Sequence, residues 1–498
     1  GYTNREHEFG TNVFLICGLF IIIMYWIYWR WHNRRLLELA AKVPGPPTIP
    51  ILGNALIFMA NPEEILSKIE VLTRKYGQYM RVWLGPDLNI TVKNPTDIRM
   101  LLTSNKVNQK GPVYELMKYY IGPGILTGGP TWRNHRKIAT PSYSKKAIQH
   151  FTKVFNVESK ELIKVLIEKE PGVTFNIYDD VVHSTTQSVC QTLMGLSKED
   201  TKNVKSLNKV VKITPDMYSL IFTKMTRWWY HIPLVFRLVG AKKIEDNYLR
   251  LIYEMTGDIV HKRRRVLAEH GVLNEDAMGI VDRYILSGEL DNNEILGETF
   301  SLFTTSQEAS AKIAAAVLLF LAHLPDWQTK VYKEIIDVLG PEDGDVSEDE
   351  LKKLLYLDMV YKEALRYLPI AALIQRTVEE DVTINEGKIT LPAGTTLALL
   401  IHDLHRDPEY WDEPNKVKPE RFMPENMKSR YSNAFIPFSL GAMDCLGRVY
   451  ATALIKTIVV HTLRHLQLEA DGKLEDLDIH VAISVKFAKG YNLRIKPR

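Results

Sequence analysis

The sequence predicts a mainly α-helical fold with a small split β-sheet portion and an N-terminal transmembrane helix. Helical periodicity of apolar residues dominates from Tyr143 to Leu339. Short β-type runs bounded by turn residues lie before this stretch and again after Arg376. A charge-free apolar segment, Val13–Trp29, precedes all of them. We therefore expect a sheet split between the two ends of the chain, with the helices between them.

The apolar segment has the properties of a membrane anchor. Val13–Trp29 is near the lower limit of about 17–25 residues for a spanning helix, and aromatic residues crowd its downstream end. Arg30, Arg34 and Arg35 follow, whereas the preceding residues mix both charge signs. The positive-inside rule then keeps the downstream side in the cytosol and the short N-terminus in the lumen. A cleaved signal peptide is the alternative, but a basic first region and a small-residue cleavage site are missing.

A proline-rich segment follows the anchor. Pro44–Pro47 predicts a stiff, non-helical connector, because proline fixes φ and removes a hydrogen-bond donor. The expected strands are Tyr79–Leu84, Leu88–Val92, Thr383–Ile384, Ile389–Leu391 and Thr396–Leu400. The predicted organisation is a luminal N-terminus at 1–12, the anchor at 13–31, a basic and proline-rich hinge at 32–54, and one catalytic domain at 55–498.

Composition narrows the class of function. A net charge of +4 over 498 residues is mild, and no basic stripe indicates a nucleic-acid partner. The three cysteines, Cys17, Cys190 and Cys445, are too few and too scattered for a disulfide framework or a zinc site. This usage is consistent with a reducing, cytosol-facing compartment.

The most informative run surrounds Cys445. This cysteine sits in a short loop between Gly441 and Gly447, followed by the apolar helical stretch Val449–Val460. A helix N-terminus presents free N–H groups and a positive dipole end, which stabilise a thiolate. Such a thiolate suits a haem iron, where it pushes electron density that favours O–O cleavage. By itself, a buried structural cysteine in a glycine-rich turn is the alternative.

Other segments occur in a matching order. Glu363 and Arg366 lie one helical turn apart, a spacing that by itself describes many solvated surface pairs. Pro419–Phe422 follows, and then the cysteine loop. Upstream, Trp132 and Arg136 are separated by three residues in a short helical stretch.

From Pro44 to the C-terminus, this series resembles the cytochromes P450. The resemblance assigns Cys445 as the axial ligand of the haem iron, with Phe438, Gly441 and Gly447 at the expected loop positions. It implies a buried supporting network of Glu363, Arg366 and Arg421, and haem propionates held by Trp132, Arg136 and Arg376. A microsomal P450 would carry non-covalent haem b in an endoplasmic reticulum membrane. It would receive electrons from NADPH–cytochrome P450 reductase, with cytochrome b5 as a second donor.

The segments Lys110–Tyr114 and Gly122–Gly128 resemble family 4 P450s, particularly insect members. Many members of that clan oxidise fatty acids and other long-chain lipids, which implies a lipophilic substrate. Ordinary core packing is the alternative for each residue expected to line the pocket. Those residues are Val113, Leu116, Met117, Tyr120, Phe303, Thr305, Ala372, Leu373, Ile374 and Val485.

The segment aligned with the distal helix departs from the family pattern. Glu308 retains the acid, but Ala309 replaces the threonine whose hydroxyl helps to deliver protons during oxygen activation. Ser306 replaces a glycine, and Ser310 is one residue too far along, about 100° around the helix. Positioned proton transfer contributes roughly 10²–10⁴-fold.

Two further positions differ from the family. Met443 replaces an arginine that normally pairs with a propionate, a bond worth about 1.5–3 kcal/mol. Thr305 replaces the glutamate that many family 4 enzymes esterify to a haem methyl, which predicts haem held without a covalent link.

Three functions are consistent with these residues. The first is a monooxygenase that receives its electrons from a reductase. Glu308, the anchor and the basic residues Arg133, Lys137 and Arg448 favour it. The second is a P450-type isomerase or dehydratase that rearranges a peroxide without external electrons. The third is a haem-containing lipid-binding protein with little turnover.

Overall fold

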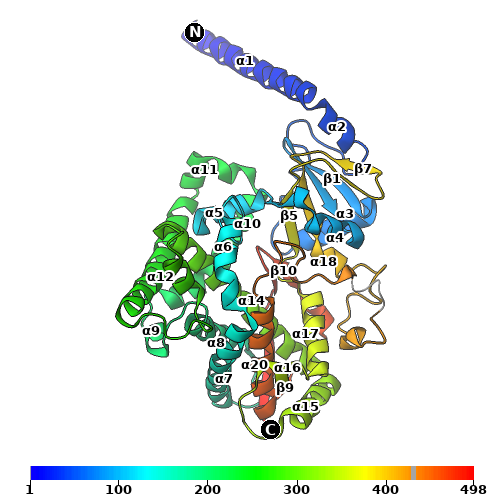
Figure 1. Cartoon of the computed structure of the whole chain (residues 1–498). Coiled ribbons are helices and arrows are strands. Elements are labelled where there is room, and N and C mark those ends of the chain that lie inside the picture. Colours follow the sequence, from blue (N-terminus) through cyan, green and yellow to red (C-terminus); the bar gives the residue numbers. More distant parts are fainter. Residues whose placement is uncertain (1, 428–432) are drawn as a thin grey trace.

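The computed structural model describes residues 2–427 and 433–498, with side chains from Val13 onward. Its first helix, α1 (Tyr2–His32), projects away from the body and is followed by α2 (Arg34–Ala40) (Figure 1). Within α1, Val13–His32 has a mean hydropathy of 1.9 and is long and apolar enough to cross a membrane. The helix begins at Tyr2, within the residues expected to form a separate luminal N-terminus.

The proline-rich connector is bound along the first strand. The Pro44 carbonyl accepts a hydrogen bond from Arg81 N (2.8 Å), and Asn54 exchanges bonds with the Trp83 backbone (2.5 and 2.9 Å). The Trp29 ring at the end of the anchor meets Trp83 edge-on, with ring centroids 5.8 Å apart. The segment expected to act as a hinge is therefore docked on the sheet that it precedes.

The main sheet has five strands in the order β1-β2-β8-β5-β3. Among the described strands, only β2 and β8 pair in parallel, and their register sets Val92 opposite Leu399. The sheet joins both ends of the chain, as the split β pattern predicted. Its strands are β1 (Tyr79–Leu84), β2 (Asp87–Val92), β3 (Gln109–Lys110), β5 (Leu373–Thr377) and β8 (Thr396–Leu400).

The described residues also form three smaller sheets. The last strand, β12, pairs with both β4 and β9, so the C-terminus is bound to the middle of the chain. The strands are β4 (Phe175–Asn176), β6 (Val382–Ile384), β7 (Ile389–Leu391), β9 (Leu466–Glu469), β10 (Ile479–Val481), β11 (Val485–Phe487) and β12 (Asn492–Pro497).

Helices make up the rest of the body (Figure 1). Those before the central helix are α3 (Ile65–Tyr76), α4 (Pro95–Thr103), α5 (Val113–Ile121), α6 (Trp132–Ala139), α7 (Lys145–Ile167), α8 (Tyr178–Gln191), α9 (Lys198–Lys202), α10 (Leu207–Thr226), α11 (Pro233–Leu238), α12 (Ala241–His270) and α13 (Ile280–Ser287). The remainder are α14 (Asn292–His323), α15 (Pro325–Leu339), α16 (Glu348–Leu351), α17 (Leu355–Tyr367), α18 (Ile401–Leu404) and α20 (Arg448–His465).

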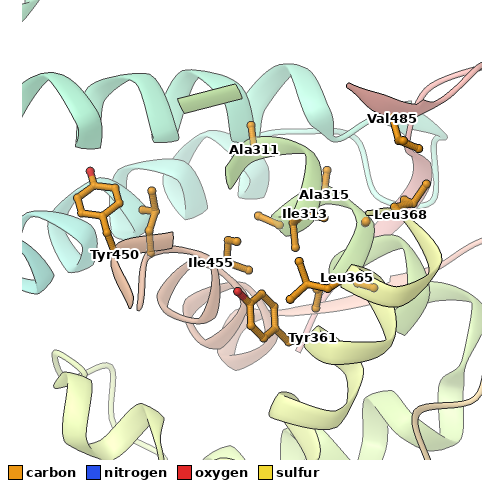
Figure 2. Close-up of a cluster of buried hydrophobic side chains, with 14 of the residues drawn as sticks. Ala311, Ile313, Ala315, Tyr361, Leu365, Leu368, Tyr450, Ile455 and Val485 are labelled. Atoms are coloured by element: carbon orange, nitrogen blue, oxygen red, sulfur yellow. The ribbon is translucent and has the colours of Figure 1, made fainter. Parts of the chain in front are cut away.

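The core is built around α14, which begins with a capping box between Asp291 and Glu294. It is 32 residues long, is buried over most of its length and contacts α8, α17 and α20. Figure 2 shows Ala311, Ile313 and Ala315 of α14 in the cluster shared with α17 and α20. Small residues let these helices approach closely, and each buried large apolar side chain contributes about 1.5–3 kcal/mol. A helix held this firmly gives the side chains on its surface fixed directions.

His461, which is fully buried, and His402, which is mostly buried, predict acid sensitivity. Burial and the nearby Arg406 lower the pKa of His402 to about 4, and burial and Arg464 lower the pKa of His461 to about 4. The ordinary pKa is about 6.5, so the unfolded chain binds more protons between these values. Stability is fully present above about pH 6.5 and falls progressively towards pH 4. The loss is several kcal/mol, because each tenfold difference in proton affinity is worth about 1.4 kcal/mol.

Urea unfolding midpoints measured between pH 7.5 and 4.5 test this prediction. His461→Gln should flatten the pH profile, because glutamine cannot titrate. An unchanged wild-type midpoint from pH 7 to 5 would show that these histidines do not govern acid stability.

Candidate haem-thiolate site

Glu363 and Arg366 form a fully buried ion pair on α17. Both side chains have no exposed surface, and the guanidinium donates to both carboxylate oxygens at 2.8 Å. Arg366 also donates to the backbone carbonyls of His405, Pro414 and Lys416. Each donor of the planar fork thus finds a fixed acceptor, a geometry that lysine cannot reproduce.

Arg421 joins this pair from a short 3₁₀ turn, Pro419–Phe422. Its Nε lies 3.4 Å from Glu363 Oε1, and its guanidinium donates to the backbone carbonyls of Glu413 and Lys416. The structure therefore brings together the three residues that the motif order linked. The network clamps the segment leading to the cysteine loop against α17.

The cysteine loop closes through a backbone bond from Cys445 N to the Phe438 carbonyl (2.9 Å). Gly441 has φ +81°, and a Cβ there would lie 2.0 Å from the Leu102 carbonyl. Only glycine fits this approach. Gly447 precedes α20, where an added Cβ would just touch Cys445 Sγ at 4.0 Å.

The loop does not by itself create a free thiolate. Cys445 is exposed, but the protein atoms packed around its thiol raise its pKa by desolvation, although the Gly447 N–H and the cations Arg136 and Arg448 act in the opposite direction. The sequence predicted that the helix N-terminus would stabilise the thiolate, but desolvation outweighs this lowering of the pKa. A metal ion deprotonates a coordinating thiol outright, so the accessible Cys445 sulfur is suited to metal ligation.

Three cations cluster near Cys445. Arg136 donates to the carbonyl and to Oδ1 of Asp444, both at 2.7 Å. Arg376 is 2% exposed, its guanidinium donates to the Gln375 carbonyl (2.9 Å), and the Tyr114 phenol lies beside it. Lys110 sits opposite Arg376 in the β3–β5 register. Burial and the charges of Arg376 and Arg136 lower the pKa of Lys110 well below its usual value.

Among the described residues, no carboxylate forms an ion pair with Arg376 or Lys110. Buried charges without partners are costly, so these groups fit a ligand that brings its own anions. The two propionates of haem have this chemistry, and Cys445 is the residue that would hold the iron. Trp132 and Arg136 lie one turn apart on α6, where Trp132 is partly exposed. Lys110 was missed as a site residue, because its nearness to Arg376 depends on strand pairing.

The distal segment of α14 presents two neighbouring faces. Thr305, Ser306 and Ala309 are partly exposed, whereas Glu308 and Ser310 are buried. The Thr305 hydroxyl donates to the Ser301 carbonyl (2.7 Å). Ser306 lies beside the Tyr143 phenol, which is also close to Cys445. Ala309 therefore shares its open face with Thr305 and Ser306.

Glu308 is directed to a different set of partners. Its carboxylate forms a buried ion pair with Lys312, one turn further along α14, and accepts a 3.0 Å bond from the Ser484 hydroxyl. Ser310 has no hydrogen-bond partner for Oγ within the described residues. Sequence reasoning missed both partners of Glu308. The i,i+4 spacing on one helix could have indicated Lys312 as a partner, whereas Ser484 lies at the tip of a hairpin far along the chain and no local pattern pointed to it.

The residues expected to line a substrate pocket fall into a partly exposed group and a buried group. Val113, Leu116 and Met117 of α5 are partly exposed, as are Thr305 and Leu373. Tyr120 is buried and its hydroxyl donates to Glu245 at 3.2 Å. The others are buried: Phe303, Ala372, Ile374 and Val485. Phe303 is fully buried within the core cluster.

A family model described as cytochrome P450 matches residues 43–492, most of the chain. The chain belongs to the cytochrome P450 family. Cytochrome P450 4d1 of Drosophila melanogaster is 30% identical over 473 residues, covering 90% of this chain and 92% of the relative. Cytochrome P450 4c3 of the same species is 26% identical, covering 98% and 94%. Human cytochrome P450 4V2 is also 26% identical, covering 94% and 91%.

These relatives place the P450 in family 4, as the sequence motifs predicted. Membership confirms the predicted fold, which is mainly helical with small sheets and one N-terminal apolar helix. It also establishes the protein as a haem-thiolate monooxygenase. The family's usual arginine in the cysteine loop is Met443 here, and this side chain is partly buried.

Proposed function

We propose that this P450 inserts one oxygen atom from O2 into a lipophilic, fatty-acid-like or other long-chain substrate. Its electrons come from NADPH through cytochrome P450 reductase, with cytochrome b5 as a second donor. The main support is that Arg133, Lys137 and Arg448 are exposed on α6 and at the start of α20, beside the cysteine loop. An exposed basic surface attracts an acidic partner and speeds its association.

The same proposal places the protein in the endoplasmic reticulum membrane, with α1 as a single-pass anchor and the body in the cytosol. The positive charge that follows the apolar span supports this orientation. The docked connector would then hold the body close to the membrane surface, where lipophilic substrates concentrate.

Bound haem supplies the chemistry of oxygen activation. Cys445 would hold the iron, while Trp132, Arg136, Arg376 and Lys110 would hold the propionates. The partly exposed face of α14 would meet the substrate, and the Glu363–Arg366–Arg421 network would keep the cysteine loop in place. Glu308, held by Lys312 and Ser484, would orient water for proton transfer next to Ala309.

We propose that the cofactor is haem b held without a covalent link. The Thr305 hydroxyl donates to the Ser301 carbonyl and cannot form the ester that a glutamate would form. Extraction with acid and organic solvent should therefore release all of the haem from the polypeptide. Thr305→Glu is the matched variant, since it restores the carboxylate that can form an ester with a haem methyl. Part of its haem should stay on the polypeptide after extraction. Haem retained on the wild-type chain would contradict this assignment.

The missing hydroxyl at Ala309 predicts weak coupling. Without a well-fitting substrate, water near Glu308 should be poorly ordered, and reduced oxygen should escape as peroxide. Ala309→Thr should raise product formed per NADPH severalfold on generic lipophilic substrates, since positioned proton transfer is worth roughly 10²–10⁴-fold in rate. Ser310→Ala is the control, because Ser310 is buried and shares no face with Ala309. High coupling in the wild type, unchanged in Ala309→Thr, would refute the proton-delivery argument.

A peroxide isomerase or dehydratase is the second candidate, favoured by Ala309 and by the ion pair that holds Glu308. Full-length protein reconstituted with reductase in lipid vesicles separates the two. The proposed function requires product that depends on NADPH and reductase and that decreases in Glu308→Gln. Conversion of fatty-acid hydroperoxides without NADPH, indifferent to Glu308→Gln, would support the isomerase. Tight lipid binding with neither activity would support a binding protein.

A further inference from the structure

A cavity of about 350 Å³ lies among α8, α10, α14 and the β10–β11 hairpin. Aromatic rings form much of its wall. Tyr178 stacks on Tyr491 with centroids 5.6 Å apart, and Phe487 meets Tyr491 edge-on at 5.4 Å. Ligand sites in proteins typically occupy about 300–1,000 Å³ and combine an apolar wall with a few polar groups. Neither Thr305 nor Ala309 lines this cavity, so it is distinct from the open face of α14.

Two polar groups in the wall lack partners. Tyr491 is 3% exposed, and in the described part of the chain its hydroxyl makes no hydrogen bond of ordinary geometry, although the Phe487 backbone lies close to it. Lys486 is half-buried on β11 and forms no ion pair with any described carboxylate. A buried hydroxyl or ammonium left without a partner carries a desolvation cost. Both groups can donate to the same acceptor if a ligand brings one.

The balance of charge indicates the sign of that ligand. Lys312 also lines the cavity, but its ammonium is paired with Glu308 and bonded to Ser484. Lys486 is then the uncompensated charge. Burial and the nearby Lys312 lower the pKa of Lys486, whereas Glu308, Asp216 and Glu63 act in the opposite direction without forming an ion pair with it. Lys312, Lys486 and Lys489 all line the cavity and no described carboxylate does, which favours an anion over a cation.

We propose that this cavity binds the carboxylate of a small lipophilic acid, at a site separate from the haem. The carboxylate accepts hydrogen bonds from Lys486 and Tyr491, and the aliphatic tail packs against the rings of Tyr178 and Phe487. A carboxylate placed here also competes with Glu308 for Lys312. The site therefore couples an acidic ligand to the residue proposed to orient water on α14.

Octanoate and octanol are suitable probes, because they share a chain and differ in charge. Calorimetric titration uses the full-length, haem-loaded protein in detergent, with an azole saturating the iron so that the haem face is blocked. Octanoate should bind more tightly than octanol. Lys486→Gln should weaken octanoate at least tenfold and leave octanol unchanged, and Tyr491→Phe should weaken octanoate severalfold. Lys473→Gln is the matched control, since Lys473 is exposed and does not line the cavity.

Three results would overturn the proposal: equal binding of octanoate and octanol, octanoate affinity unchanged in both variants, or octanoate binding abolished by the azole. The last would place the acid at the haem face instead. Circular dichroism verifies the fold of each variant. Tyr491→Phe keeps the ring and removes only the hydroxyl, so it decides the question if Lys486→Gln fails to fold. The titration measures binding alone, whereas the proposed function is tested by NADPH-driven turnover. Failure of one can therefore be distinguished from failure of the other.

Discussion

Replacing Arg366 with alanine is expected to destroy the folded, haem-loaded protein. The change leaves the Glu363 carboxylate buried without its partner and removes the donors for the carbonyls of His405, Pro414 and Lys416. Breaking a buried pair in this way costs about 3–5 kcal/mol, against a total stability of about 5–15 kcal/mol. Haem content and the urea unfolding midpoint measure the loss.

Two variants make this result specific. Arg366→Lys keeps the charge but cannot donate from a planar fork. Its haem content and urea unfolding midpoint should therefore lie between those of Arg366→Ala and the wild type. Arg74→Ala breaks an exposed ion pair with Glu70 on a surface helix. Such surface pairs contribute about 0–1 kcal/mol, so the haem content and the unfolding midpoint should change little. An Arg366→Ala protein that keeps its haem, with stability within about 1 kcal/mol of wild type, would show that the network does not support the cysteine loop.

The second large effect is expected at Cys445. The reduced carbon-monoxide complex of the wild type should show the red-shifted Soret band of thiolate ligation, and Cys445→Ser should abolish it because a serine hydroxyl is not a thiolate. Cys190→Ser is the control: Cys190 is fully buried in the core, and burial raises the pKa of its thiol to about 12. Persistence of the band in Cys445→Ser would exclude this residue as the iron ligand.

Local sequence pattern predicted the elements that depend on local chemistry. The expected strands Tyr79–Leu84, Ile389–Leu391 and Thr396–Leu400 coincide with β1, β7 and β8, since alternation and turn residues mark their ends. The apolar stretch after the cysteine loop is α20. Glu363 and Arg366 were predictable as a pair, because helical spacing sets both on one face.

Features fixed by distant contacts could not be predicted in this way. Two-residue β4 exists only because β12, more than three hundred residues later, pairs with it. Lys110 becomes a site candidate through its register with Arg376. The direction of Glu308 depends partly on Ser484, which is brought near by the β10–β11 hairpin. In each case the deciding partner is remote, and no local pattern encodes it.

Incorporation of isotopically labelled dioxygen tests directly whether this P450 acts as a monooxygenase. Full-length protein and reductase in vesicles would receive NADPH, labelled O2 and a mixture of long-chain lipids, and the products would be analysed by mass spectrometry. We expect products that carry one labelled oxygen atom, that require NADPH and that are absent with Cys445→Ser. Products formed without NADPH, whose oxygen comes from an added hydroperoxide and not from O2, would contradict it.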